Sequence, residues 1–169
     1  NFKNEIPLFI IFRLLGVVTD KDIIELIVYD YENPSNKPIL NLLYASLKDA
    51  RNIVTQDAAY EYVSTIINYI GYPKELQMDK EHQYKYINNL LKNDFLPNVG
   101  KSFKKKAIFL GYMTARLLNC FIGREDYDDR DNYINKRIDL PGILLGNLFR
   151  QYFSKLVKDM RNAIMKEFN

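Results

Sequence analysis

The sequence is poor in residues that form cross-links and metal sites, with one cysteine, Cys120, and one histidine, His82, among 169 residues. A single cysteine excludes a disulfide within the chain and favours a reducing compartment. One histidine and one cysteine fall short of the ligand set of a zinc site. His82, which stands among charged residues, is therefore interpreted as a solvated side chain on a helix surface.

Long apolar runs and the short motifs of autonomous enzymes are also missing. The apolar stretch 6–15 is interrupted by Arg13 and is too short to cross a bilayer, so no membrane association is expected. The sequence has no glycine-rich phosphate loop, nucleophile elbow or cysteine and histidine pair. It begins at Asn1 without an initiator methionine or a targeting segment and ends in a helical pattern, which suggests a piece of a longer protein. An enzyme that acts alone is disfavoured, and no catalytic residue is predicted.

Apolar residues make up 47% of the chain, which excludes a disordered protein and predicts a globular core. The formal net charge of +3 is mild. It favours a local basic patch over a wholly basic nucleic-acid binder.

The apolar residues recur with helical spacing, and the sequence predicts a mainly α fold, an irregular multi-helix domain. Thr19 and Thr55 are predicted N-caps, and Gly16, Gly71 and Gly123 predicted helix ends. The predicted helices cover 2–15, where a strand remains an alternative, then 19–33, 38–47, 55–71, 79–96, 103–123 and 141–167. We expect a domain at 1–124 and a second segment at 125–169, made of a charged loop and a long helix.

Two predicted helices carry apolar stripes. In the helix before Gly123 the residues predicted to face inward are Phe103, Ala107, Leu110, Met113, Leu117 and Phe121. The last helix has a longer stripe from Leu145 to Phe168, which one small domain would hardly cover. The opening and last helices are therefore expected to pack on other proteins or on further sequence.

The charged loop 125–142 reads EDYDDRDNYINKRIDLPG and has neither helical nor strand periodicity. Clustered carboxylates are typical ligands of hard cations. Arg130 lies inside this cluster, however, and the spacing lacks the turn glycine and terminal acid of a calcium loop. No metal site is predicted, and a salt-bridged, hydrogen-bonded loop is the alternative.

Two basic segments are candidates for phosphate contacts. The run Lys101 to Lys106 has the pattern of a solvated helix start, with a role toward phosphate as the alternative. Lys136 and Arg137, beside Asn135 and downstream of Arg130, offer directional donors for phosphates or base edges. Ion pairing within the loop explains the same residues equally well, and the sequence leaves both interpretations open.

At this loop the chain resembles the second-largest, beta-like subunit of multisubunit DNA-directed RNA polymerase. The family motif reads approximately DDRDHxGNKRLDLAG, and residues 128–142 read DDRDNYINKRIDLPG. FLGYMTARLL at 109–118 and NDFLPNVG at 93–100 resemble two further family motifs, as do the opening and last helices. The collinear motifs cover essentially the whole chain.

The resemblance implies the lobe together with the return of the chain into the protrusion, which form one wall of the DNA cleft. It implies a part in transcription within a nucleotidyltransferase whose catalytic residues and Mg²⁺ lie outside this fragment, which then holds no cofactor. The implied partners are other polymerase subunits, DNA in the cleft and a general initiation factor on the lobe. The implied location is intracellular, in the nucleus or, for a viral enzyme, the host cytoplasm. The residues that it points to for nucleic-acid binding are Arg130, Asp131, Asn135, Lys136 and Arg137.

Three positions depart from the family motif: Asn132 replaces histidine, Ile134 replaces glycine and Pro141 replaces alanine. Ile134 disfavours a positive φ, which predicts a local change in the path of the loop. Asn132 cannot carry a charge, so a phosphate contact there would be weaker. These departures suggest a divergent polymerase, viral or protozoan. The alternative function, from a different class, is a helical protein-interaction scaffold without a nucleic-acid role.

Overall fold

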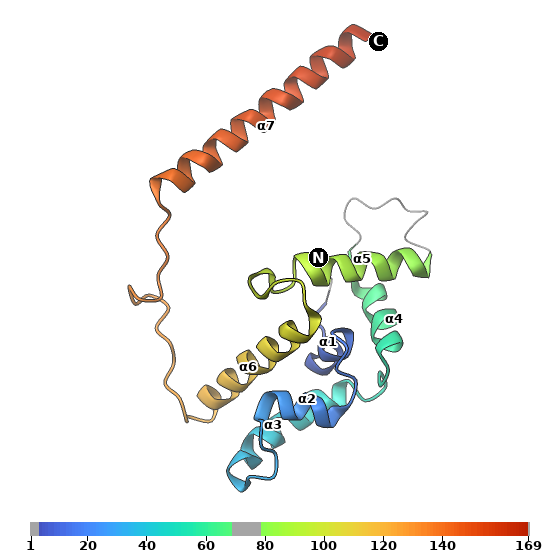
Figure 1. Ribbon diagram of the computed structural model, residues 1–169, viewed down its shortest axis with the longest axis vertical. Helices are drawn as coiled ribbons and strands as arrows, with labels where there is room; N and C mark the ends of the chain where they lie inside the picture. The colour runs from blue at the N-terminus through green and yellow to red at the C-terminus, as the bar shows by residue number, and fades with distance from the viewer. Residues whose placement is uncertain (1–3, 69–78, 169) are drawn as a thin grey trace. The chain divides into compact units, whose positions relative to one another are not determined.

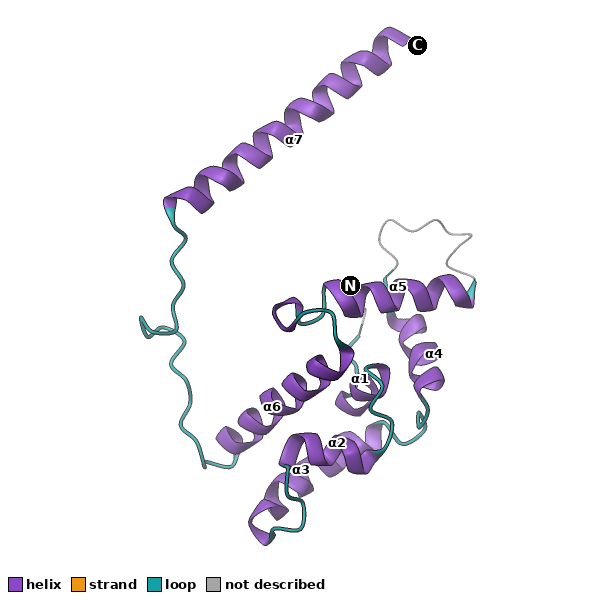
Figure 2. Cartoon of the chain, viewed as in Figure 1, coloured by secondary structure: helices purple, strands orange, loops and turns teal. Residues whose placement is uncertain are grey.

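The computed structural model describes residues 4–68 and 79–168. This part of the chain is helical, as Figures 1 and 2 show, and the predicted mainly α fold class is confirmed. The chain divides into two compact units, Asn1–Asp126 and Tyr127–Asn169. The helices are α1 (Leu8–Leu14), α2 (Asp20–Val28), η1 (Pro34–Asn36), α3 (Lys37–Asp49), α4 (Gln56–Ile66), α5 (Lys80–Asn93), η2 (Pro97–Val99), α6 (Phe103–Phe121) and α7 (Pro141–Phe168).

The centre of the first unit is α1, which lies against α2, α3 and α4 (Figure 1). Its side chains Phe9, Ile10 and Phe12 are fully buried, so the helix is apolar on nearly every face. Because Leu8–Leu14 is an α-helix, the strand alternative for this segment is excluded. The expectation that the opening helices carry a large exposed apolar surplus is wrong for α1, because its apolar residues form the core itself.

Buried Arg13 fixes α1 to its neighbours. Its guanidinium donates to the carbonyl oxygen of Ala50 at 2.9 Å and to that of Ile53, and it pairs with the Asp20 carboxylate at 2.5 Å. Only 1% of Arg13 is exposed, and these partners compensate for part of the loss of water around its charge. Its Nε is buried and has no hydrogen-bond partner in the described residues. Arg13, which interrupts the apolar stretch of the sequence, therefore links α1 to the start of α2 and to the turn after α3.

The helix ends follow the predicted capping chemistry in several places. Thr19 Oγ1 accepts from the Asp22 backbone N–H at 3.1 Å, and Thr55 Oγ1 accepts from that of Ala58 at 3.2 Å. Gly16 takes φ 93° after α1, and the Val17 N–H donates to the Phe12 carbonyl across it, which is a Schellman end.

The predicted end of the second helix at Asn33-Pro34 is wrong, because α2 ends at Val28. Tyr29 then takes φ 64°, and the Asp30 carboxylate accepts from the Glu32 N–H at 3.2 Å. Such a local side-chain bond offers the backbone an alternative to the next helical turn. The fourth long helix also ends early, at Ile66, where Ile67 turns to an extended conformation and is buried. Gly71, its predicted end, lies outside the described residues.

The predicted inward face of α6 is correct in its first half and wrong in its second. Ala107 is buried, whereas Met113, Leu117 and Phe121 are exposed. The buried line runs instead through Gly111 and Thr114, because α6 lies so close to α2 that only a small residue fits at Gly111. The second half of α6 therefore presents an apolar face to solvent within its own unit.

The second unit contains α7, predicted at 141–167 and confirmed over Pro141–Phe168. Its described apolar side chains are about half exposed or more, because nothing in this unit covers them. The helix is still too polar to be a membrane span, and none of the described helices has the length and hydropathy to cross a bilayer. The exposed stripe consists of Leu145, Leu148, Phe149, Tyr152, Phe153, Leu156, Val157, Met160 and Ile164.

Candidate nucleic-acid interface

The charged loop begins where α6 ends at a second Schellman motif. Gly123 takes φ 76°, and the Arg124 N–H donates to the Asn119 carbonyl at 2.9 Å. The Arg124 guanidinium also donates to Asn36 Oδ1 at 3.1 Å and to the Ser35 carbonyl. These bonds hold the end of the first unit at η1, and the loop leaves from this fixed point.

Within the second unit, residues 129–136 form a compact knot of turns, which we call the Asx knot. Asp129 Oδ1 accepts from the Asp131 N–H at 2.9 Å, and Asn132 Oδ1 accepts from the Ile134 N–H at 3.2 Å. Each is an Asx turn, in which the side chain replaces a backbone acceptor. The Asn135 side-chain amide closes the knot by donating to the Asp129 carbonyl at 2.8 Å. The irregular composition of this segment thus produces a defined path without helix or strand.

The Asx knot brings the five predicted site residues into one short segment. Arg130, Asp131, Lys136 and Arg137 are all exposed, and their side chains have no ion pair or hydrogen bond in the described part of the chain. Asn135 differs, because its amide nitrogen is engaged by the Asp129 carbonyl. The alternative of ion pairing between Lys136 or Arg137 and Asp128 or Asp131 therefore gains no contact from either cation in the described residues.

The charges of this segment are mixed. Residues 127–140 hold three cationic side chains and four aspartates, so the segment is not a basic patch by count. One aspartate, Asp129, is turned inward to the backbone of the knot. Anion binding here would depend on where the side chains of Arg130, Lys136 and Arg137 point more than on the net charge of the segment.

The departures from the polymerase motif fit this geometry. The φ of Ile134 is not positive. Among the described non-glycine residues, only Tyr29 and Leu96 have a positive φ. Asn132 supplies the acceptor for the Ile134 N–H, so an L-residue with a branched side chain is accommodated without strain. Pro141 occupies the first position of α7, where its missing N–H has no helical partner to lose.

The basic run at the start of α6 splits into two kinds of lysine. Lys101, Lys104 and Lys105 are exposed, as a solvated helix start requires. Lys106 is fully buried, and its ammonium donates to the carbonyl oxygens of Leu91 at 2.6 Å, Lys92 at 2.8 Å and Phe95 at 2.5 Å. A phosphate role for the whole run is therefore excluded, since one of its members caps the end of α5.

Burial lowers the pKa of Lys106 from its usual value, while its three acceptors are neutral carbonyls at the negative end of a helix. The buried position of Lys106 was not predicted, because a lysine in a basic run normally faces water. The apolar residues Phe103, three positions before it, and Leu110, four positions after it, were the available signals.

The acidic residues do not assemble a metal centre. In the described ranges no group of three or more histidine, cysteine, aspartate or glutamate side chains has the arrangement that could hold an ion. Asp129 accepts a hydrogen bond within the knot, and Arg130 lies between Asp129 and Asp131 in the sequence.

Comparison with known proteins gives one consistent result. A family model described as "RNA polymerase Rpb2, domain 2" matches residues 1–139. The chain is 42% identical over 167 residues to DNA-directed RNA polymerase II subunit 2 of Arabidopsis thaliana, which covers 97% of this chain and 13% of that protein. It is 35% identical to subunit RPB2 of Schizosaccharomyces pombe, with the same coverage, and 34% identical over 166 residues to subunit Rpo2 of Saccharolobus solfataricus, covering 96% of this chain and 14% of that protein. The chain thus spans about an eighth of the length of these relatives.

Proposed function

We propose, on the premise that this chain belongs to the RNA polymerase Rpb2 domain 2 family, that it serves DNA-directed RNA synthesis as part of a second-largest polymerase subunit. The family match over residues 1–139 is the observation that carries this proposal. The similarity to the relatives extends over 97% of the chain and so includes most of α7.

The proposed contribution of this segment is structural and not catalytic. In this proposal nucleotide addition and its Mg²⁺ belong to other parts of the assembled enzyme, as the resemblance to the polymerase family implies. In this proposal the first unit is the lobe, and the Asx knot with α7 leads the chain back to the protrusion. The segment then forms part of the wall of the DNA cleft.

Contact with nucleic acid is proposed for the segment that holds Arg130, Asp131, Asn135, Lys136 and Arg137. The three cations meet phosphate, and Asn135 holds the backbone through its bond to the Asp129 carbonyl. Two observations support it. The three cations are exposed and lack partners in the described chain, and the Asx knot fixes the backbone that carries them. A cation on a fixed backbone loses less conformational entropy when it meets a phosphate.

Other polymerase subunits are the proposed partners of this chain, and the rest of the second-largest subunit is the proposed cover of the α7 stripe. Apolar side chains such as Leu148, Tyr152 and Leu156 stand exposed along one helix, and burying them yields about 25 cal/mol for each Å² of apolar surface. A general initiation factor is proposed to dock on the first unit. An intracellular location accompanies this function, in the nucleus or, for a viral enzyme, in the host cytoplasm.

The test compares two double variants of the assembled polymerase that lose the same charge. Lys136→Ala with Arg137→Ala removes two cations of the knot, and Lys158→Ala with Arg161→Ala removes two exposed cations of α7. Binding to bubble DNA is measured at several salt concentrations. The knot variant is expected to lower the slope of log affinity against log salt by about 0.9 for each lost duplex phosphate contact, or about 0.7 on a single strand.

Nucleotide addition by the knot variant on preassembled scaffolds is expected to stay close to that of the parent enzyme. An unchanged salt slope in the knot variant, or equal losses in both variants, would end the nucleic-acid assignment. The helical scaffold without a nucleic-acid role would then be the better interpretation.

A further inference from the structure

The end of α2 has an unusual backbone conformation. Tyr29 follows the helix with φ 64° and ψ −50°, and the Asp30 N–H donates to the Val28 carbonyl at 2.7 Å. These angles and this bond define a γ-turn of the rare, strained form. For a residue that carries a Cβ, such a conformation persists only where the surrounding contacts hold it. Contacts around Tyr29 are therefore required to keep it there.

The residues after Val28 do not by themselves end α2. Residues 29–32 contain neither glycine nor proline, and the helix predicted from the sequence included them. A helix over these residues would place Tyr29 at a negative φ, and the Asp30 N–H would donate to the Leu26 carbonyl, four residues back. Pro34 would then end the helix. An α2 extended over residues 29–32 is thus an unstrained alternative to the observed turn.

A network of hydrogen bonds supports the observed turn. The Asp30 carbonyl accepts from the Asn36 side-chain amide at 2.8 Å. In an extended helix this carbonyl would face Pro34, which has no N–H to donate. Asn36 Oδ1 accepts in turn from the Arg124 guanidinium at 3.1 Å, which also donates to the Ser35 carbonyl. We call Asp30, Ser35, Asn36 and Arg124 the Arg124 network.

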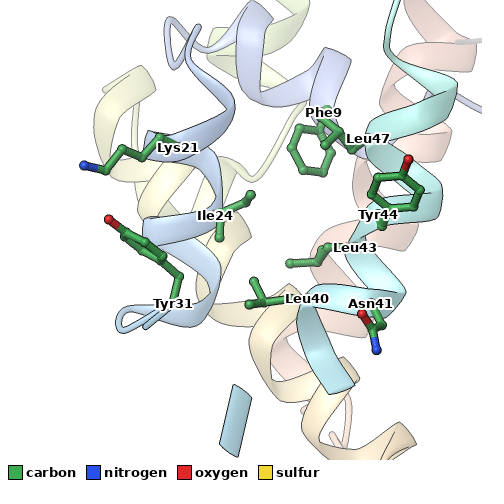
Figure 3. Close-up of a pocket in the computed structure, with 9 residues that line it drawn as sticks. All are labelled: Phe9, Lys21, Ile24, Tyr31, Leu40, Asn41, Leu43, Tyr44 and Leu47. Carbon is green, nitrogen blue, oxygen red and sulfur yellow. The ribbon is translucent and has the colours of Figure 1, made fainter. Parts of the chain in front are cut away.

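Beyond the turn the chain runs back beside α2. Lys21 Nζ lies 5.6 Å from the centre of the Tyr31 ring, and Figure 3 shows the two side chains next to each other on the same side of α2. In a continued helix, positions 21 and 31 would lie about 15 Å apart along one axis. The contact between Lys21 and Tyr31 therefore belongs to the bent form and is lost in the extended one.

Arg124 also stands at the start of the charged loop. Gly123 closes α6, the Arg124 N–H donates to the Asn119 carbonyl, and the loop 125–142 begins at the next residue. Tyr29, the Arg124 network and the first residues of the loop all lie in the first unit. A change at the start of the loop and a change at the end of α2 therefore act on the same guanidinium, and two sites coupled in this way influence each other reciprocally.

We propose that the end of α2 is a two-state element controlled by Arg124. While Arg124 is bonded within its network, the strained turn is kept and Tyr29 is 93% exposed. When the start of the charged loop draws Arg124 away from Ser35 and Asn36, α2 extends to Glu32 and the surface around Tyr29 changes. This inference goes beyond the proposed function and holds whether or not the Asx knot contacts nucleic acid.

The test measures the backbone conformation of residues 29–32 by NMR in the isotope-labelled 169-residue chain. The Cα chemical shift and the coupling between the amide and α protons distinguish a positive φ at Tyr29 from a helical one. Arg124→Ala removes the guanidinium, and the Cα signals of residues 29–32 are expected to move toward helical values. Arg51→Ala, which removes an exposed arginine after α3, is the control and is expected to leave these signals in place.

A second variant distinguishes the release of strain from a general loss of order. Glycine adopts a positive φ without strain and disfavours a helix. In the Tyr29→Gly chain, Arg124→Ala is therefore expected to leave the signals of residues 30–32 in place, because no strain remains to be released.

Three results would overturn this proposal. The first is a negative φ at Tyr29 in the parent chain. The second is an effect of Arg124→Ala on residues 29–32 that is absent or no larger than that of Arg51→Ala. The third is movement of these signals toward random-coil values in Arg124→Ala, with or without Tyr29→Gly, which would show disorder in place of a longer α2.

Discussion

Gly111 of α6 lies against the backbone of Leu26 in α2, so close that a Cβ on the glycine would stand 2.5 Å from the Leu26 carbonyl oxygen. That oxygen belongs to a helix and cannot move aside alone. The contact therefore sets how near the two helices approach and which face of α6 enters the core. It also gives a physical reason for the glycine in FLGYM, a segment noted for its resemblance to the polymerase family.

Gly111→Ala is expected to destabilise the chain by about 2 kcal/mol, because the cost of overpacking exceeds the gain in helix propensity. Urea unfolding measures the change. Gly146→Ala is the control, since the added Cβ would meet only the Arg150 side chain at an ordinary 3.7 Å. If Gly111→Ala is as stable as the parent, α2 and α6 do not pack as closely as described.

Lys106 gives a second stability prediction. Lys106→Met keeps much of the side-chain volume but leaves the carbonyls of Leu91, Lys92 and Phe95 without their donor. The loss is expected to be about 2–4 kcal/mol, since unpaired buried polar groups cost more than the hydrogen bonds themselves contribute.

The matched control is Lys105→Met, one residue earlier on the same helix and exposed. Its effect should stay within about 0.5 kcal/mol. Equal unfolding midpoints for the two methionine variants would show that the Lys106 ammonium does not cap α5.

The hydrogen bonds of Asp79 at the start of α5 predict that the free energy of unfolding falls at acid pH. The Asp79 carboxylate accepts from the Glu81 N–H at 3.2 Å and lies 2.5 Å from His82 Nδ1, and the hydrogen bond to His82 is the larger reason that its pKa falls below the usual 3.8. The folded carboxyl group thus holds its proton less tightly than the unfolded one. Its stabilisation is complete above the unfolded pKa of 3.8 and is lost as pH falls through the lower folded pKa.

The measurement is the free energy of unfolding between about pH 5 and about pH 2. Asp79→Asn retains an N-cap acceptor but does not titrate, so its slope below the unfolded pKa of 3.8 should be shallower. A residual slope should remain, because the hydrogen bond from Lys85 lowers the pKa of Glu81 as well. Asp49→Asn, a loss of one exposed carboxylate at the end of α3, is the control. Identical slopes in Asp79→Asn and the parent would contradict the prediction.

The sequence predicted the parts of the fold that depend on local chemistry. Thr55 and Gly123 mark helix ends because a hydroxyl acceptor and a positive φ are requirements of the few residues beside them. The early end of α2 at Val28 was missed, although one of its causes is local, since Asp30 Oδ1 accepts from the Glu32 N–H two residues on. The second bond, from the Asn36 side-chain amide to the Asp30 carbonyl, spans six residues, and no short pattern in the sequence predicts it.

Tertiary contacts explain the other differences between prediction and structure. Met113 was predicted to face inward because it is apolar. The close approach of α6 to α2 at Gly111 instead directs the face that contains Gly111 into the core, and Met113 is exposed. The candidate site was located as a segment by composition and resemblance. Its Asx knot was not foreseen, because the bond from Asn135 to the Asp129 carbonyl spans six residues.

Substitution of Asn135 distinguishes two roles of the Asx knot in the proposed contact with nucleic acid. The knot either holds the backbone that presents the cations, or it places Asn135 against a base. Its amide closes the knot through the Asp129 carbonyl, so Asn135→Ala should loosen the backbone that carries Lys136 and Arg137 while leaving every charge in place. Affinity of the assembled polymerase for bubble DNA is expected to fall about fivefold, which corresponds to about 1 kcal/mol of lost preorganisation. The salt slope should stay the same, because no phosphate contact is removed.

The control is Asn147→Ala, an exposed asparagine of α7 in the same unit, which should bind like the parent. Binding is measured on two bubbles of different base sequence. Direct reading of a base by Asn135 predicts a loss on one sequence only, because base-edge contacts carry sequence information and phosphate contacts do not. A knot that only presents cations predicts the same loss on both. An unchanged affinity on both bubbles would show that closure by Asn135 has no part in binding, and the support that the knot lends to the contact of Lys136 and Arg137 with DNA would be lost.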